Sequence, residues 1–237
     1  MKPTLLAAPA IAFGLLAACS PQASAPAEPA PAPVAEAPPA PPAPDVSKLP
    51  AGAYKLDPSH ASLTFHVNHL GFSHYTASFS TFTADLQLDP ANPETATVTA
   101  TIDLASLTLP NPPKGFKDEL LNKDWLDKAT TPLLKFESTS VSKTGPATAD
   151  ITGNFTMKGI TKPVVLHAAF NGGYEGHPYD PNARIGFSAK GMLKRSDFDV
   201  SVGIPVPPST MGVFDDVSFE IEAEFSGPEW KGAPPAQ

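Results

Sequence analysis

The sequence predicts an all-β, antiparallel fold for the chain beyond residue 50. Apolar and polar side chains alternate with a period of two in several runs, and turn-forming Pro, Gly and Asn clusters separate those runs. Only one stretch, residues 115–126, has helical spacing. Strict alternation gives a strand one buried and one solvated face, which is typical of antiparallel sheets. The pattern indicates about eight or nine strands and one short helix.

The alternating runs follow one another along the chain. They cover residues 62–68, 85–88, 97–104, 151–157, 164–170, 185–193 and 217–225. The last run is the clearest, because apolar side chains at its odd positions alternate with a serine and three glutamates. Each run therefore predicts a strand that turns its apolar face toward an interior.

Turns and breaks separate these strands. The turn clusters are residues 89–93, 143–146 and 171–173. In the predicted helix, Phe116, Leu120 and Leu121 share one face. Residues 203–212 should be irregular, because three prolines there prevent a continuous hydrogen-bonded ladder.

A sheet of this size has to bury one face. It either packs on a second sheet or closes on itself, and periodicity does not choose between a sandwich and a barrel. Eight closed strands enclose an interior that side chains fill or that holds one small ligand. The single cysteine of the chain allows no internal disulfide, so core burial or a bound ligand must stabilise the domain.

The charge and motif content exclude several function classes. The formal net charge is -8, which disfavours nucleic acid and an anionic membrane surface as partners. One cysteine cannot build a Cys-rich zinc or iron–sulfur site. The chain also has no phosphate-cradling glycine loop and no dinucleotide fingerprint, so it predicts no cofactor.

The N-terminus predicts export and lipid anchoring. The apolar stretch from Leu5 to Ala18 follows Lys2 and is too short to span a bilayer, as expected of a signal peptide over residues 1–18. It ends in Leu-Ala-Ala-Cys, which resembles a bacterial lipobox with Cys19 as the lipidated residue. Periplasmic localisation follows, and Ser20 in place of Asp favours the outer membrane by analogy. The alternative is an ordinary signal with a cysteine nearby by chance.

The predicted domain boundaries come from composition. Residues 19–50 are the anchor cysteine and a disordered Pro/Ala-rich linker, which behaves as a semi-rigid polyproline II spacer. Residues 51–227 form the β domain, and residues 228–237 are a disordered tail.

Several segments of the domain resemble the YceI-like family. They are YKLDPSH (54–60), LTFHVNHLG (63–71), LKFES (134–138), GNFTMKGITKPV (153–164), GFSA (186–189) and RSDF (195–198). The resemblance implies an eight-stranded, lipocalin-like antiparallel barrel with a long apolar cavity. It implies binding of a polyisoprenoid or another long-chain amphiphile, without catalysis. Two positions, Ala61 and Asp199, depart from the family pattern.

The candidate ligand site is the lining and mouth of that cavity. The expected apolar members are Phe65, Val67, Phe79, Phe155, Phe170, Phe187 and Phe198. Small residues on the same faces should leave room for an apolar chain, namely Ala100, Gly153, Ala168, Ala189 and Gly191.

Two polar residues complete the candidate site. His69 shares the inward parity of its strand and ends it, so it either contacts a ligand head group or bonds a backbone carbonyl at the rim. Arg195 either forms an ion pair with Asp197 or presents its guanidinium to a head group.

Other motifs carry less weight. A metal site could be suspected from four nearby histidines, namely His60, His66, His69 and His74. On one strand, however, His66 and His69 face opposite sides of the sheet and His60 lies far from His66, so no metal site is predicted. The segment Gly186–Lys190 differs from the Gly-x-Ser-x-Gly nucleophile motif of hydrolases only at its last position, which is Lys. It lies on a predicted strand, whereas that motif requires a strand-to-helix turn, so no nucleophilic serine is predicted.

The resulting expectation is a binding protein with no enzymatic activity. Its partners are a lipid ligand in the cavity and a membrane held through Cys19, and a homodimer is compatible with the sequence. Two alternatives remain at this point: a scaffold domain with a solid core, and an esterase acting on lipids.

Overall fold

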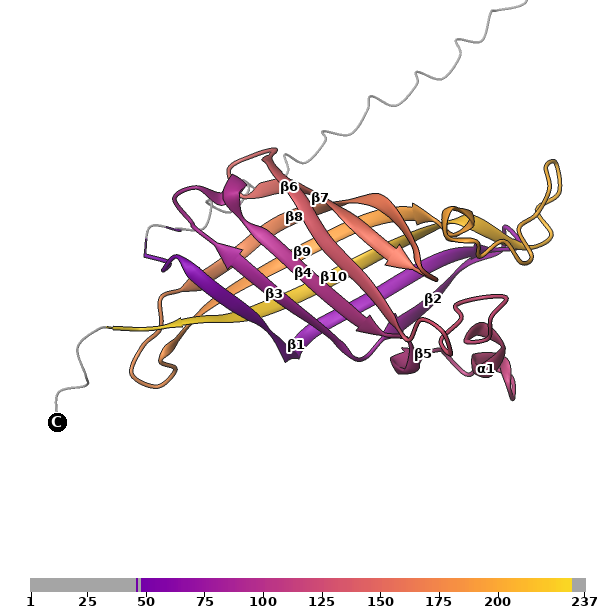
Figure 1. Ribbon diagram of the computed structural model, residues 1–237, viewed down its shortest axis with the longest axis horizontal. Coiled ribbons are helices and arrows are strands. Elements are labelled where there is room, and N and C mark those ends of the chain that lie inside the picture. Colours follow the sequence, from indigo (N-terminus) through magenta and orange to yellow (C-terminus); the bar gives the residue numbers. More distant parts are fainter. Residues whose placement is uncertain (1–45, 47, 232–237) are drawn as a thin grey trace, which may run out of the picture. The chain divides into compact units, whose positions relative to one another are not determined.

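The strands close into a barrel (Figure 1). The computed structural model describes residues 46 and 48–231. The predicted signal peptide, Cys19 and nearly all of the predicted linker therefore lie outside the described residues.

The described residues form ten strands, one α-helix and three short 3₁₀ turns. The strands are β1 (Gly52–His69), β2 (Ser73–Phe79), β3 (Phe82–Leu88), β4 (Thr97–Asp103), β5 (Leu107–Thr108), β6 (Leu133–Lys143), β7 (Thr148–Met157), β8 (Ile160–Tyr174), β9 (Asn182–Lys194) and β10 (Val213–Glu229). The helix α1 spans Phe116–Leu120, and the 3₁₀ turns are η1 (Pro93–Thr95), η2 (Leu104–Ser106) and η3 (Arg195–Phe198).

The ten strands occupy eight positions in an antiparallel ring. The long strand β1 pairs with β10 on one edge, and on its other edge it pairs first with β3 and then with β2. The strand β5 continues β4 past η2 and pairs with β2. Consecutive strands are neighbours from β6 to β10, so the chain winds up and down around the ring. The eight-stranded antiparallel barrel is thus confirmed.

The alternation in the sequence separates the inside of the barrel from the outside. Cross-strand partners such as Phe65 and Phe219 on β1 and β10, or Ala168 and Ala189 on β8 and β9, both face the interior. The strand β2, whose inward side chains include Tyr75 and Phe79, is not among the predicted runs.

The helix is shorter than expected. The helix α1 covers five residues, and the rest of the predicted stretch 115–126 forms turns, in which the Leu126 N–H donates to the Leu120 carbonyl. Phe116, Leu120 and Leu121 nevertheless pack on the core as predicted. The stretch 199–212 contains no strand, in agreement with its prolines.

The packed domain extends slightly beyond both expected boundaries. Leu49 is buried, and the Tyr54 hydroxyl donates to the Pro50 carbonyl at 2.6 Å, so packing begins within the predicted linker. At the other terminus β10 runs to Glu229, and the Trp230 N–H donates to the Pro181 carbonyl.

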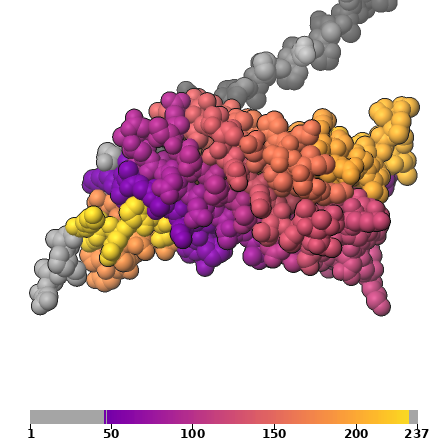
Figure 2. Space-filling view, viewed as in Figure 1, coloured from indigo at the N-terminus to yellow at the C-terminus, as the bar shows by residue number. Residues whose placement is uncertain are grey.

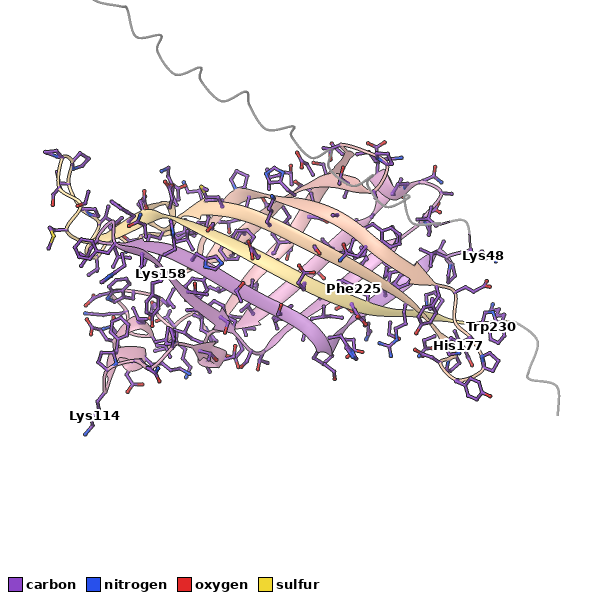
Figure 3. All side chains as sticks on the ribbon, turned by 180° about the vertical axis from the view of Figure 1, so that it is seen from behind. Lys48, Lys114, Lys158, His177, Phe225 and Trp230 are labelled. Carbon is purple, nitrogen blue, oxygen red and sulfur yellow. The ribbon has the colours of Figure 1, made fainter. Side chains whose placement is uncertain are left out.

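The barrel has two different ends. The helix end carries α1, the β1–β2 turn (70–72) and the loop 199–212, and the N-terminal end carries residues 48–51 with the turns 89–96, 144–147 and 175–181. Figure 3 shows Lys114 and Lys158 at the helix end, opposite Lys48, His177 and Trp230.

The buried core is divided between those two ends. The helix-end cluster consists of Leu63, Ala77, Phe79, Leu104, Leu107, Leu109, Leu134, Met157, Phe198 and Val200. The N-terminal cluster consists of Leu49, Tyr54, Leu86, Ala183, Ile185, Ala223 and Phe225. A solid barrel would carry one contiguous core, so the division points to an unfilled interior between the clusters.

Candidate functional site

The interior of the barrel holds a cavity of about 850 Å³. Its walls are the inward side chains of the strands, and its lining reaches from Phe116 and Trp125 at the helix end to Pro146 at the N-terminal end. Ile221, halfway along β10, lines the cavity and packs on both core clusters. The volume lies in the upper part of the range found for small-molecule sites.

The structure brings most of the sequence-predicted site residues together around this cavity. The predicted residues that line it are Phe65, Val67, His69, Phe79, Phe155, Phe170, Phe187 and Arg195. Several of the rings pack in pairs: Phe65 with Phe79 at 5.5 Å between centroids, and Phe170 with Phe187 at 5.4 Å. The aromatic wall is therefore built from residues far apart in the sequence.

Phe198 does not line the cavity, contrary to the prediction. It is buried in the helix-end cluster, and its ring stands edge-on to Phe155 at 5.5 Å and 85°. Its side chain therefore supports the cavity wall from behind. The reason is that η3 leaves the strand register after Lys194, so the inside–outside alternation no longer applies.

Two of the small residues also have a different role. A Cβ on Gly153 would lie 2.3 Å from the Phe136 ring, and one on Gly191 would lie 2.5 Å from the Phe219 ring. These glycines therefore make room for aromatic rings and leave no space for a ligand. Ala100, Ala168 and Ala189 do line the cavity.

The lining includes residues that sequence reasoning missed. Leu109 to Pro113 and Trp125 approach from the segment between β5 and β6, and Leu49 approaches from the predicted linker. No strand periodicity marks them, because they lie outside the strands. Only the clustering of Leu, Phe and Trp in 107–126 could have indicated an apolar contact there.

Arg195 is held inside the helix end by backbone carbonyls. Its side chain donates to Val213 at 2.6 Å, to Val200 at 2.8 Å and to Phe214 at 3.0 Å, and the residue is 5% exposed. The guanidinium also lies 5.3 Å from the centroid of the Trp125 ring. Burial lowers the pKa of Arg195 from its ordinary value.

The predicted ion pair between Arg195 and Asp197 does not form. In the described part of the chain, no carboxylate lies within 4.0 Å of the Arg195 guanidinium. Asp215 instead accepts hydrogen bonds from the backbone N–H and the hydroxyl of Ser196, at 2.8 Å each. Arg195 thus joins η3 to the start of β10 while its side chain remains on the cavity wall.

His69 lies at the helix-end mouth. It is the last residue of β1, it pairs with Val213 across the sheet, and its exposed side chain contributes to the cavity lining. Among the described residues that line the cavity, the side chains that can carry a positive charge are those of His69, Lys143 and Arg195, and no carboxylate is present. The groups of the site that can carry charge at neutral pH are therefore basic.

The other candidate residues lie elsewhere. The Nδ1 atom of His66 lies 2.8 Å from the Thr76 hydroxyl, and that of His60 lies 3.1 Å from Asp57. Residues 48–231 bring no three metal-ligating side chains together. Ser188 lies within β9 and donates to Glu222 at 2.6 Å, away from the cavity lining.

A polar network covers the outside of the N-terminal end. The Arg184 guanidinium donates to Asp57 and, at 3.1 Å, to Asp180, which also accepts from the Tyr174 hydroxyl at 2.6 Å. The bond from Arg184 lowers the pKa of Asp57 far below its usual value, and the bond from Tyr174 lowers that of Asp180. The same contact with Asp180 raises the pKa of Tyr174.

A closed antiparallel barrel around an apolar cavity defines a lipocalin-like binding fold. Residues 54–225 match the YceI-like domain, and the chain belongs to that family.

No helix in the described ranges has the length and apolarity needed to cross a bilayer.

Curated relatives agree with this assignment. The chain is 36% identical to a UPF0312 protein of Pseudomonas savastanoi over 173 residues, which covers 72% of this chain and 86% of the relative. It is 37% identical to a UPF0312 protein of Pseudomonas fluorescens over 178 residues, covering 74% and 88% of the two chains.

Solved structures share the fold. The YceI protein of Campylobacter jejuni is 28% identical with a TM-score of 0.57, covering 68% of this chain and 90% of that one. BcnA of Burkholderia cenocepacia is 24% identical with a TM-score of 0.59, covering 71% and 98%. A polyisoprenoid binding domain from Saccharophagus degradans is 12% identical with a TM-score of 0.54, covering 74% and 98%. The last two likenesses concern the fold alone.

Proposed function

We propose that this protein binds a long-chain amphiphilic lipid, such as a polyisoprenoid, in the barrel cavity. The observation that carries the proposal is the continuous apolar cavity of about 850 Å³ between two separate core clusters. A scaffold domain with a solid core would have no such space. The polyisoprenoid class is favoured because a domain named for binding that class has the same fold.

The cavity offers enough apolar contact for tight binding. Each buried CH₂ contributes roughly 0.8 kcal/mol. A chain with about fifteen buried carbons would gain on the order of 12 kcal/mol before the cost of association, which is at least ~4 kcal/mol. Affinity then comes from the apolar tail and needs no specific polar contact.

The head group would lie at the helix-end mouth beside His69 and Arg195. Arg195 keeps N–H groups beyond the three that bond carbonyls, since a guanidinium has five in total. Because the lining is basic and lacks carboxylates in the described residues, we expect anionic head groups to bind better than cationic ones. The protein acts by binding and has no esterase activity in this proposal, because Ser188 lies off the lining.

The anchor is a separate part of the proposal. Cys19 carries the lipid, and the protein resides in the periplasm at the outer membrane. Metabolic labelling with a fatty-acid analogue should label the wild-type protein and leave the Cys19→Ser variant unlabelled. Label in that variant would contradict the anchor, and wild-type protein in the inner-membrane fraction would contradict the outer-membrane location.

Native mass spectrometry tests the ligand directly. The protein is purified from its source membrane in mild detergent and measured without delipidation. We expect a bound mass in the range of long-chain lipids, and fragmentation identifies its head group. Protein that carries no lipid mass and does not bind an apolar fluorescent probe would refute the proposal.

A further inference from the structure

Two neighbouring loops at the helix end expose large apolar side chains. Phe72 in the β1–β2 turn is 79% exposed, and Val206 and Met211 in the loop 199–212 are 79% and 70% exposed. Figure 2 shows the loop around residue 205 standing out from the body of the barrel. Exposed apolar side chains that gather in one place mark an interaction site more often than scattered ones do.

A backbone hydrogen bond joins the two loops, because the Leu70 N–H donates to the Gly212 carbonyl at 2.8 Å. A second one closes the loop 199–212 at its base, where the Val213 N–H donates to the Gly203 carbonyl at 2.8 Å. Within the loop, the Ser209 N–H donates to the Val206 carbonyl at 3.0 Å. The apolar tips are therefore presented on an ordered frame.

The apolar surface continues from the loop into the cavity. Val200 and Val213, at the two ends of the loop, both line the cavity, and His69 at its mouth begins the β1–β2 turn. An amphiphile that leaves the cavity at this mouth would therefore pass directly onto the apolar loop tips.

The charges fit an uncharged lipid interface. Residues 200–213 and 70–73 contain no charged side chain. Asp199, where the loop begins, and Asp216 on β10 are exposed and contact Lys158 and Lys194, so these two lysines are paired with carboxylates. The two loops themselves therefore offer no charged partner to an anionic surface.

The length of chain between Cys19 and the barrel also fits a membrane. The first described residues, Val46 and 48–51, lie at the N-terminal end of the barrel, opposite the loops. Residues 20–45 could span up to about 85 Å at ~3.3 Å per residue, and β10 could span up to about 56 Å at the same rise. A domain anchored at Cys19 could therefore turn its helix end back to the same membrane.

We propose that Phe72, Val206 and Met211 form a membrane-docking surface that inserts into the interface of an uncharged, zwitterionic lipid bilayer. The docked mouth would let the cavity exchange an amphiphile with the bilayer without passing it through water. This exchange role rests on the proposed function, whereas the docking itself does not.

The experiment uses the chain from Ser20 onward. It contains every strand of the closed ring and has no cysteine, since Cys19 is the only one. Val206→Cys then carries one environment-sensitive fluorophore, and Tyr179→Cys, 95% exposed at the opposite end, is the matched control. With phosphatidylcholine vesicles, we expect a blue shift at position 206 and none at position 179.

A second measurement gives the size of the effect. The unlabelled chain with Phe72→Ser, Val206→Ser and Met211→Ser should bind phosphatidylcholine vesicles at least about tenfold more weakly in a flotation assay. Tyr179→Ser should bind like the wild type. The triple variant should also take up an apolar dye normally, because none of its three changed residues lines the cavity.

Each other outcome overturns the docking surface in its own way. Equal fluorescence shifts at positions 206 and 179 would refute the docking surface. A shift at position 206 that grows with protein concentration without vesicles would assign the loops to a second copy of the chain. Vesicle binding that requires phosphatidylglycerol would show that electrostatic attraction, and not insertion of apolar side chains, holds the protein at the membrane. Loss of dye uptake in the wild type would instead refute the proposed lipid cavity.

Discussion

The two ends of the barrel stabilise an arginine in opposite ways. At the helix end, buried Arg195 donates to three backbone carbonyls and lies against Trp125. At the N-terminal end, Arg184 lies near the surface and pairs with the carboxylates of Asp57 and Asp180. The first end carries uncharged, apolar loops, and the second carries a charged network.

The difference shows how one ring of strands supports two kinds of opening. Carbonyls satisfy the Arg195 donors without adding negative charge, so the helix-end mouth stays basic and apolar. The carboxylates at the N-terminal end are costly to remove from water, so they suit a surface that remains hydrated. The contrast favours the helix end as the mouth that meets lipid.

Arg195→Ala should produce the largest effect on folding. It leaves three backbone carbonyls in the helix end without their donor, so we expect a loss of about 3–5 kcal/mol in the free energy of unfolding. Chemical denaturation measures it. Arg195→Lys should recover part of the loss, because an ammonium keeps the charge but not the fork geometry. A loss below about 1 kcal/mol would mean that the two arginines are equivalent.

Leu49→Ala tests whether the N-terminal end depends on the segment before β1. Leu49 belongs to the N-terminal cluster, and truncating a buried leucine costs about 2–3 kcal/mol. Leu133→Ala, at an exposed leucine, is the control and should change stability by less than about 0.5 kcal/mol. Equal melting temperatures for both variants would place Leu49 outside the folded unit.

Ala189→Phe tests the space between the two ends. The side chain points into the cavity, so we expect affinity for an apolar probe to fall about tenfold, which is ~1.4 kcal/mol, with little change in stability. Lys190→Phe changes the neighbouring outward residue and should bind normally. Unchanged binding in Ala189→Phe would place the probe outside the cavity.

Arg184→Ala should have the smallest effect, with a defined pH dependence. The free energy of unfolding should fall by about 1 kcal/mol at neutral pH, because the ion pair between Arg184 and Asp57 is only partly buried. Since the pKa of Asp57 is lowered in the folded state, its contribution is present above the ordinary carboxyl pKa and disappears as pH falls toward the lowered value.

Unfolding curves at pH 7 and at a series of pH values falling from about 4 check this prediction. Wild type and Arg184→Ala should converge in acid. If the difference in the free energy of unfolding between the two proteins stayed constant with pH, Arg184 would act through packing instead of charge.

The sequence predicted the antiparallel strands because a period of two directly reports which face of a strand is buried, and the barrel followed only from the resemblance to the YceI-like family. It placed Phe65, Phe155 and Phe187 on the inside for that reason. It misplaced Phe198 because η3 breaks the strand register there. It also missed Leu49, since a leucine beside a proline-rich segment has no periodic neighbours.

By itself, the sequence determined the strands, their inward faces and the family. Local alternation and short motifs carry that information without any knowledge of contacts. Only the tertiary structure decided that the interior is hollow, that Gly153 and Gly191 make room for aromatic rings, and that Arg195 binds carbonyls. Those features depend on which side chains meet across the ring, and ring closure between β1 and β10 joins residues about 150 positions apart.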